Sequence, residues 1–176
     1  KSTWPEADDK LVDRYLHCIE SVACLMLERG YHISMYSTDN MDIVTKDNIL
    51  KRLNVLSRQS MSALHDVKPK SAKELVRDVQ SMDIMIASRL HAVLISHLFC
   101  KPVLAISYDR KVRQHMKDMD QDQFCIDIEN VTIENILVIL DKIFESKEMI
   151  KTNLKEKRSK YIEAISKQYE DLIKLI

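Results

Sequence analysis

The sequence predicts an α/β fold with a doubly wound parallel sheet and helices on both of its faces. Short strand-like runs alternate along the chain with segments of helical periodicity. Two of these runs, Met82–Ala87 and Val103–Ser107, are apolar at nearly all consecutive positions, which is typical of parallel strands buried on both faces. The chain has 176 residues and 45% hydrophobic content, enough for one compact core, so we expect residues 1–176 to form a single domain.

The first third of the chain predicts helix, strand, helix and a weakly marked strand. A helical series follows Asp9 and stops at Gly30, the only glycine in the sequence. Glycine suits a left-handed C-cap because it lacks the Cβ atom that opposes this conformation. We expect a strand over 31–36, a helix over 47–56 and a strand within 61–67.

The middle of the chain carries the clearest strand, helix, strand pattern. Ser71 and Glu74 form a capping box, in which each side chain can accept from a free amide at a helix start. We then expect a strand over 82–87, a helix over 89–100 and a second strand over 103–107.

The remaining elements continue the alternation and end in helices. The pattern predicts a helix over 110–119 and a short strand over 124–128. Two helices should close the chain, over 133–144 and 147–175. The second has a thin apolar stripe and many Lys and Glu residues, which indicates a solvated face.

Composition excludes several classes of protein. Lys plus Arg and Asp plus Glu each number 27, so the chain lacks the positive field on which sequence-independent nucleic-acid binding relies. The apolar runs are too short for a membrane-spanning helix, and no signal peptide is visible. Four cysteines without paired spacing indicate reduced thiols, so we expect a cytoplasmic protein: Cys18, Cys24, Cys100 and Cys125. The chain opens without Met at Lys1, and we expect that a preceding segment has been removed.

Common catalytic signatures are absent from the sequence. A single glycine excludes a Walker loop and a dinucleotide fingerprint, and no nucleophile elbow or zinc motif occurs. We therefore expect no metal and no cofactor.

Two predicted helix starts carry cations that could bind an anion. Ser88 is the expected N-cap of the helix that opens with Arg89 and His91, and Asp109 is the expected N-cap of the helix that opens near Lys111. Cations in the first turn of a helix interact unfavourably with the helix dipole. An anion bound between the two turns would make the arrangement favourable, because it attracts both the cations and the positive ends of the dipoles. An arginine can bind a phosphate or carboxylate in bidentate fashion, and an imidazole can transfer a proton. This pattern favours a small phosphorylated ligand, although the same side chains could simply reach solvent.

Three blocks of the sequence resemble the polysaccharide pyruvyl transferase family. They are Pro69, Ser71, Glu74 and Leu75; Asp83–Ala92, which contains "SRLHA"; and Lys101–Val112, which contains "YDRKV". The likeness extends more weakly back to Trp4-Pro5 and forward through Ile128. Where the family commonly has Gly in the turn after the second block, this chain has Cys100 and Lys101.

The resemblance implies an enzyme that transfers a pyruvyl group from phosphoenolpyruvate to a sugar hydroxyl, forming a pyruvate ketal. It further implies a role in the biosynthesis of bacterial cell-surface polysaccharides, either exopolysaccharide or cell-wall glycan. The acceptor would be a glycan or a lipid-linked sugar. His91 would be the general acid or the phosphate ligand. Six matching positions would bind the donor: Ser88, Arg89, Leu90, His91, Tyr108 and Lys111.

Family members are similar to glycosyltransferases of the GT-B type, in which two Rossmann-like halves face a cleft. By this resemblance the chain is the carboxyl-terminal half. The amino-terminal half would be its partner, supplying the opposite wall of the cleft, and we expect residues 1–176 alone not to catalyse the reaction.

Two other functions are compatible with the same residues. A glycosyltransferase half could hold the diphosphate of a nucleotide sugar at the two cationic turns, but the ribose-binding carboxylate that it needs has no convincing candidate. A non-catalytic module could instead dock a partner on the last helix, over 147–176. The sequence leaves these alternatives open.

Overall fold

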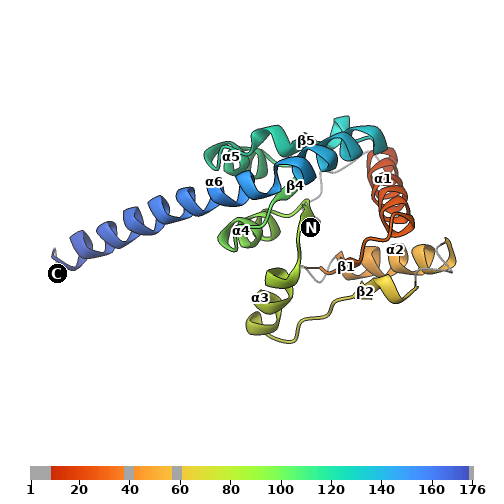
Figure 1. Cartoon of the computed structure of the whole chain (residues 1–176), viewed down its shortest axis with the longest axis horizontal. Coiled ribbons are helices and arrows are strands. Elements are labelled where there is room, and N and C mark those ends of the chain that lie inside the picture. Colours follow the sequence, from red (N-terminus) through yellow and green to blue (C-terminus); the bar gives the residue numbers. More distant parts are fainter. Residues whose placement is uncertain (1–8, 38–41, 57–60, 175–176) are drawn as a thin grey trace.

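The computed structural model describes residues 9–37, 42–56 and 61–174, and within them helices alternate with parallel strands (Figure 1). The α/β class and the parallel pairing that the sequence predicts are confirmed. The strands form two small sheets instead of one. The Trp4-Pro5 segment lies outside the described residues.

The first sheet belongs to a lobe built from the first third of the chain. Its elements are α1 (Asp9–Glu28), β1 (Ile33–Met35), α2 (Ile43–Leu56) and β2 (Leu64–Asp66), with a 3-10 turn just before β2. Strands β1 and β2 pair in parallel, with Ile33 opposite Leu64. All four elements match predictions from the sequence, with shorter strands and an earlier start of α2.

A small core and one ion pair hold this lobe together. Ala23 on α1 packs with Ile49 and Leu53 on α2, and Leu53 is completely buried. Arg52 donates to both carboxylate oxygens of Glu20, at 3.1 and 3.2 Å, and so also joins α2 to α1.

Gly30 ends α1 as predicted. Its φ is +83°, in the left-handed region, and its amide donates to the Leu27 carbonyl at 3.0 Å. The Tyr31 amide then donates to the Met26 carbonyl at 3.0 Å. These two bonds satisfy carbonyls at the helix end and turn the chain into β1.

The second sheet has three parallel strands in the order β3-β4-β5. The elements that form and flank it are α3 (Ala72–Ser81), β3 (Met85–Ala87), α4 (Leu90–Leu98), β4 (Val103–Ser107), α5 (Arg110–Asp118) and β5 (Cys125–Asp127). Every residue of β4 is buried, and α4, α5 and α6 all pack against this strand. Burial on both faces explains why this strand is apolar at consecutive positions.

The predicted caps can be checked bond by bond. Ser71 Oγ accepts from the Glu74 amide at 3.2 Å, and Asp109 Oδ1 accepts from the Lys111 amide at 2.8 Å, so both predicted N-caps are confirmed. The Glu74 carboxylate does not return to Ser71 as in a full capping box. It accepts instead from the amide of Lys70, at 2.8 Å.

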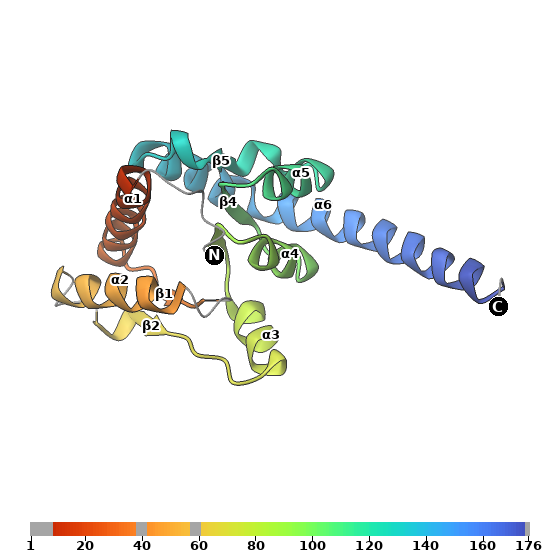
Figure 2. The ribbon, with the colours of Figure 1, turned by 180° about the vertical axis from the view of Figure 1, so that it is seen from behind.

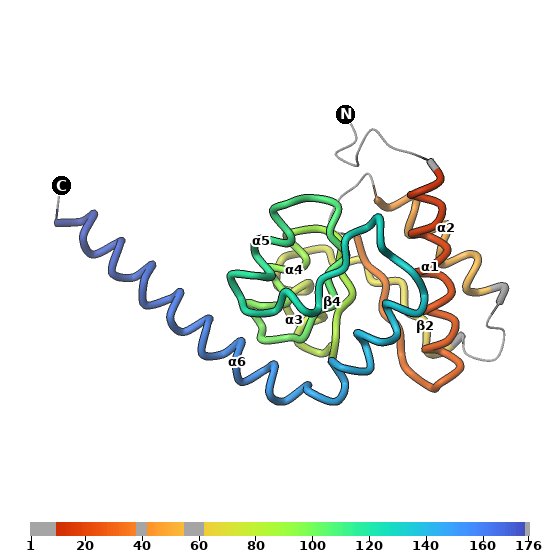
Figure 3. Tube along the Cα trace, turned by 90° about the horizontal axis from the view of Figure 1, so that it is seen from above, coloured from red at the N-terminus to blue at the C-terminus, as the bar shows by residue number. Residues whose placement is uncertain are grey.

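The chain closes with one long helix, α6 (Ile133–Ile173), and the prediction of two helices is wrong. The junction at 145–147 contains neither Pro nor Gly, so nothing there breaks the hydrogen-bond ladder. Ile150 and Leu154 lie beyond the junction and are buried in the core. The described residues after 160 are exposed, and this part of α6 extends away from the rest of the molecule (Figures 1 and 3).

Within the described residues, β1 is an edge of the first sheet and β3 is an edge of the second, and no further strand pairs with either edge. The Met35 carbonyl accepts from the Val67 amide, just after β2. Because successive residues of a strand point their N–H and C=O groups to opposite sides, those of Ser34 and Tyr36 point away from β2. Likewise the Met85 amide donates to the Pro102 carbonyl at 3.0 Å, which turns the peptide groups of Ile84 and Ile86 away from β4. No pairing joins β1 to β3 within the described ranges, so the single doubly wound sheet expected from the sequence does not form.

Candidate functional site

A cleft of about 990 Å³ lies between β1 and β3. Both unpaired edges line it, through Ser34 and Tyr36 on one side and Ile84 and Ile86 on the other. Its volume is at the upper end of the range of about 300–1,000 Å³ that small-molecule sites occupy. Seen from behind, α1, α2 and β1 lie to one side of the molecule and α4, α5 and β4 to the other (Figure 2).

The polar end of the cleft lies where β1 and β3 finish. The chain leaves β1 through α2 to reach β2, and it leaves β3 through α4 to reach β4. Open α/β proteins bind ligands beyond the carboxyl ends of strands, at the point where successive crossovers diverge. At this end the cleft is lined by Ser37 and Asp42 from the first crossover, and by Ser88 and Arg89 from the second.

Arg89 supplies a positive charge at this end of the cleft. Its Nε donates to Asp42 Oδ2 and its Nη2 to Asp42 Oδ1, both at 2.8 Å, so the carboxylate holds one whole edge of the guanidinium. Its Nη1 is 3.4 Å from the Tyr108 hydroxyl. Asp42 holds the pKa of Arg89 above its usual range. Only 18% of the side chain is exposed, so Arg89 does not simply reach solvent.

Ser88 has a different role from the predicted N-cap. Its Oγ lies 2.6 Å from the hydroxyl of Tyr15 on α1, and burial raises the pKa of that tyrosine. The N-cap of α4 is Arg89, and its side chain makes no capping bond. The N-cap side chain of α4 therefore satisfies none of the amides that open this helix, and these amides lie beside a cation.

The structure brings together only part of the set predicted from the sequence. Ser88 and Arg89 line the cleft, and Tyr108 reaches Arg89 from the end of β4. His91 is exposed on the first turn of α4, and Lys111 is exposed on the first turn of α5. Neither of these two residues lines the cleft. Leu90, which begins α4, is half-buried and packs on the main core.

No pattern in the sequence indicates the residues that α1, α2 and the segment just before α2 bring to the cleft. Tyr15, Asp42, Thr45 and Lys46 all line it. Lys46 is buried, and its Nζ donates to Asp66 on β2 at 2.5 Å. None of these residues belongs to a motif, and Asp42 lies 47 positions before Arg89. Only the parallel topology makes them neighbours.

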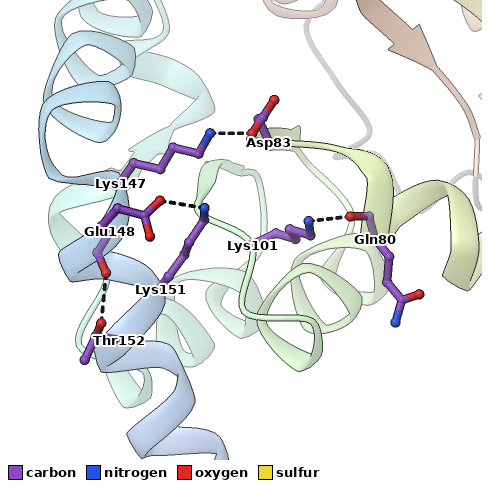
Figure 4. A network of polar contacts seen from close by, with 7 residues as sticks. All are labelled: Gln80, Asp83, Lys101, Lys147, Glu148, Lys151 and Thr152. Atoms are coloured by element: carbon purple, nitrogen blue, oxygen red, sulfur yellow. Dashed lines mark hydrogen bonds and ion pairs between the residues drawn. The ribbon is translucent and has the colours of Figure 1, made fainter.

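A second ion pair lines the other end of the cleft. Asp83, just before β3, pairs with Lys147 on α6, and this pair lowers the pKa of Asp83 (Figure 4). On α6 Lys151 pairs with Glu148 at 2.7 Å, while Lys101 Nζ donates to the Gln80 carbonyl at 2.6 Å. The cleft thus has one carboxylate near Arg89 and another, separately paired, at its opposite end.

Three further properties of the described residues bear on function. All four cysteines are free, and three of them are buried. No group of three or more His, Cys, Asp or Glu side chains in the described part of the chain could hold a metal ion. The helices that the structure describes include none that is long and apolar enough to cross a membrane.

Comparison with known proteins assigns the chain to a family. No solved structure matches it significantly. The family model described as polysaccharide pyruvyl transferase matches residues 5–110, more than half of the chain. The match includes Asp42 and the whole segment 88–91, and it ends one residue before Lys111. The chain belongs to the polysaccharide pyruvyl transferase family, a family of transferases.

Proposed function

We propose that the cleft binds phosphoenolpyruvate and that the chain takes part in transferring its pyruvyl group to a sugar hydroxyl. The observation that carries this proposal is Arg89, a mostly buried guanidinium at the carboxyl ends of β1 and β3. Its present partner, Asp42, is a carboxylate, the same group that the donor carries. The family membership supplies the reaction class.

The chemistry of phosphoenolpyruvate suits this end of the cleft. The donor has a carboxylate and a phosphate on one carbon, so it needs two groups of donors close together. The guanidinium of Arg89 can bind one anionic group in bidentate fashion. The amides of Leu90 and His91, at the start of α4, where the N-cap side chain makes no capping bond, are suited to the other.

The reaction needs a proton at one carbon and a leaving phosphate at the next. A sugar hydroxyl oxygen bonds to C2 of the donor and loses its proton, while the C2–C3 double bond opens and C3 gains a proton to become a methyl group. A second hydroxyl of the same sugar then bonds to C2, the bond from C2 to the phosphate oxygen breaks, and inorganic phosphate leaves with the electron pair and a proton. Cations near the phosphate stabilise the charge that develops there.

We assign the proton transfer to His91 and a contribution to phosphate binding to Lys111. His91 follows Arg89 by two residues, and its exposed imidazole is accessible to a ligand that bridges the start of α4. Lys111 is the second residue of the next helix, α5, and its amide donates to the N-cap side chain of Asp109. Both would act on the part of the donor that projects out of the cleft, where an acceptor and a second protein surface can approach.

Calorimetric titration of phosphoenolpyruvate into the chain tests this function. Arg89→Ala should weaken binding by at least about tenfold, because a charge-assisted bidentate contact is lost. His91→Ala should weaken it less. Arg113→Ala is the matched control, since Arg113 is paired with Asp127 at 2.8 Å and does not line the cleft. Tighter binding of a nucleotide sugar than of phosphoenolpyruvate would contradict the proposal. So would an affinity for phosphoenolpyruvate that neither Arg89→Ala nor His91→Ala changes.

A further inference from the structure

Asp42 occupies the edge of Arg89 that an anionic ligand would use. The two bonds from Nε and Nη2 form a planar, bidentate pair, the geometry in which arginine recognises carboxylates and phosphates. Both residues line the cleft, and the two side chains are 18% and 24% exposed. The pair has no net charge, so an anion approaching Arg89 gains little unless it displaces or outweighs Asp42.

Separating this pair is feasible because each side chain keeps favourable surroundings. Asp42 directly precedes α2 (Ile43–Leu56), and a carboxylate at the start of a helix is stabilised by the helix dipole. A quarter of its side chain already contacts solvent, so hydration can replace part of the lost bond. Arg89 keeps its contact with Tyr108, 3.4 Å from Nη1. Each side chain therefore keeps other favourable interactions when the pair separates.

We propose that Asp42 is a specificity-determining residue, which holds Arg89 in the absence of ligand and thereby admits only ligands with more negative charge than a single carboxylate. This inference rests on the proposed function of the cleft. A monocarboxylate such as pyruvate can only exchange one bidentate carboxylate pair for another, and it also loses translational freedom. A phosphate-bearing ligand offers a second negative charge and more acceptor oxygens, so it can displace Asp42.

Three anions separate the possible outcomes when they are titrated into the unmodified chain and into Asp42→Asn: inorganic phosphate, pyruvate and phosphoenolpyruvate. The unmodified chain should bind the two phosphate compounds and not pyruvate. Asn keeps the size of the side chain and removes its charge, so the variant should bind both phosphate compounds about tenfold more tightly and should now bind pyruvate.

Asp127→Asn is the matched control. Asp127 also pairs with an arginine, Arg113, at 2.8 Å, but neither residue lines the cleft. This variant should leave the affinities of all three anions unchanged. An equal gain in both variants would overturn the inference, because the effect would then be one of general charge and not of competition for Arg89.

The result for Asp42→Asn can fail in two informative ways. Unchanged affinity would overturn the inference by showing that Asp42 does not compete with the ligand. Reduced affinity would overturn it by showing that Asp42 positions Arg89 while the ligand binds elsewhere on the guanidinium. A gain for phosphate without any preference for phosphoenolpyruvate would support the role of Asp42 and contradict the proposed donor.

A measurement on the unmodified chain guards against an effect of the variant on folding. The Arg89 Nε–H resonance should shift as phosphate is added and should saturate with the binding curve, since this hydrogen leaves the Asp42 carboxylate for the ligand. A resonance that stays fixed while phosphate binds would overturn the inference. Thermal unfolding of Asp42→Asn should remain a single transition.

Discussion

His97, on α4, lies 3% exposed in the core and is held in its neutral form. Its Nδ1 is 3.0 Å from Nε2 of His115 on α5, and its Nε2 has no hydrogen-bond partner among the described residues. Burial, with a smaller contribution from His115, lowers the pKa of His97 to about 3. Burial also lowers the pKa of His115, against the nearby charge of Asp118.

This histidine should make the fold less stable in mild acid. Below about pH 6.5 the unfolded chain protonates His97 while the folded chain does not, so its contribution to stability is lost as the pH falls from 6.5 towards 3. At pH 5 the free energy of unfolding should be lower by about 2 kcal/mol through this residue alone. Between pH 7 and pH 5 the carboxylates with lowered pKa values, such as Asp66 and Asp83, are ionised in both the folded and the unfolded chain, so they add little to this change.

Urea unfolding at pH 7 and pH 5 checks this prediction. In His97→Met, which fills a similar volume without a titrating group, the fall in stability between the two pH values should be smaller by about 2 kcal/mol. His17→Gln, on an exposed position of α1, is the control and should keep the full fall. An equal fall in His97→Met and the unmodified chain would show that His97 does not stay neutral.

The residues of the site were predictable from the sequence only where the chain itself places them side by side. Arg89 and Ser88 follow a strongly apolar strand, so their position at its carboxyl end could be read from the local pattern. Asp42 follows a strand of only three residues and reaches Arg89 through tertiary structure. The role of Ser88 was mistaken because an N-cap serine and a serine bonded to Tyr15 have the same local sequence.

Among the elements, α6 divides into a packed part and a free part. Ile136, Ile143, Ile150 and Leu154 lie in the main core, each 1% exposed or less. Ile165 on the same helix is 50% exposed, and its neighbours after 160 are exposed as well. The helix is therefore anchored by its first half, and the second half adds little tertiary packing.

Paired alanine substitutions test this division of α6. Ile150→Ala should lower the free energy of unfolding by about 2–5 kcal/mol, because it leaves a cavity in the core. Ile165→Ala should cost no more than about 0.5 kcal/mol, because its side chain is already half in water. Urea unfolding of both variants measures the difference. A large loss for Ile165→Ala would mean that the outer part of α6 is buried in solution, as it would be against a partner.

The positions and caps of the helices were predicted better than the breaks between elements. The spacing of apolar residues and the caps at Ser71, Asp109 and Gly30 are local signals, and they hold in the structure. The division of α6 into two helices failed because a drop in apolar periodicity is not a break in the backbone. Where a continuous helix leaves the core, its apolar periodicity falls just as it does in a loop.

At the scale of the whole molecule, the arrangement of strands decides where the site lies. The alternation of strands and helices was enough to predict parallel pairing, which the structure confirms. It was not enough to predict two sheets, because the pairing of β1 with β3 depends on contacts between segments about 50 residues apart, which no local pattern encodes. The cleft opens at the position where a continuous sheet would have been.

The central claim is that the donor binds at this cleft through Arg89. The most direct test is to titrate phosphoenolpyruvate into the ¹⁵N-labelled chain and to map the amide resonances that shift. We predict that the shifts cluster at the carboxyl ends of β1 and β3, on Ser37, Asp42, Ser88, Arg89 and Leu90, and that Arg89→Ala abolishes them. Shifts confined to the basic start of α5 or to α6, or shifts that persist in Arg89→Ala, would contradict the claim.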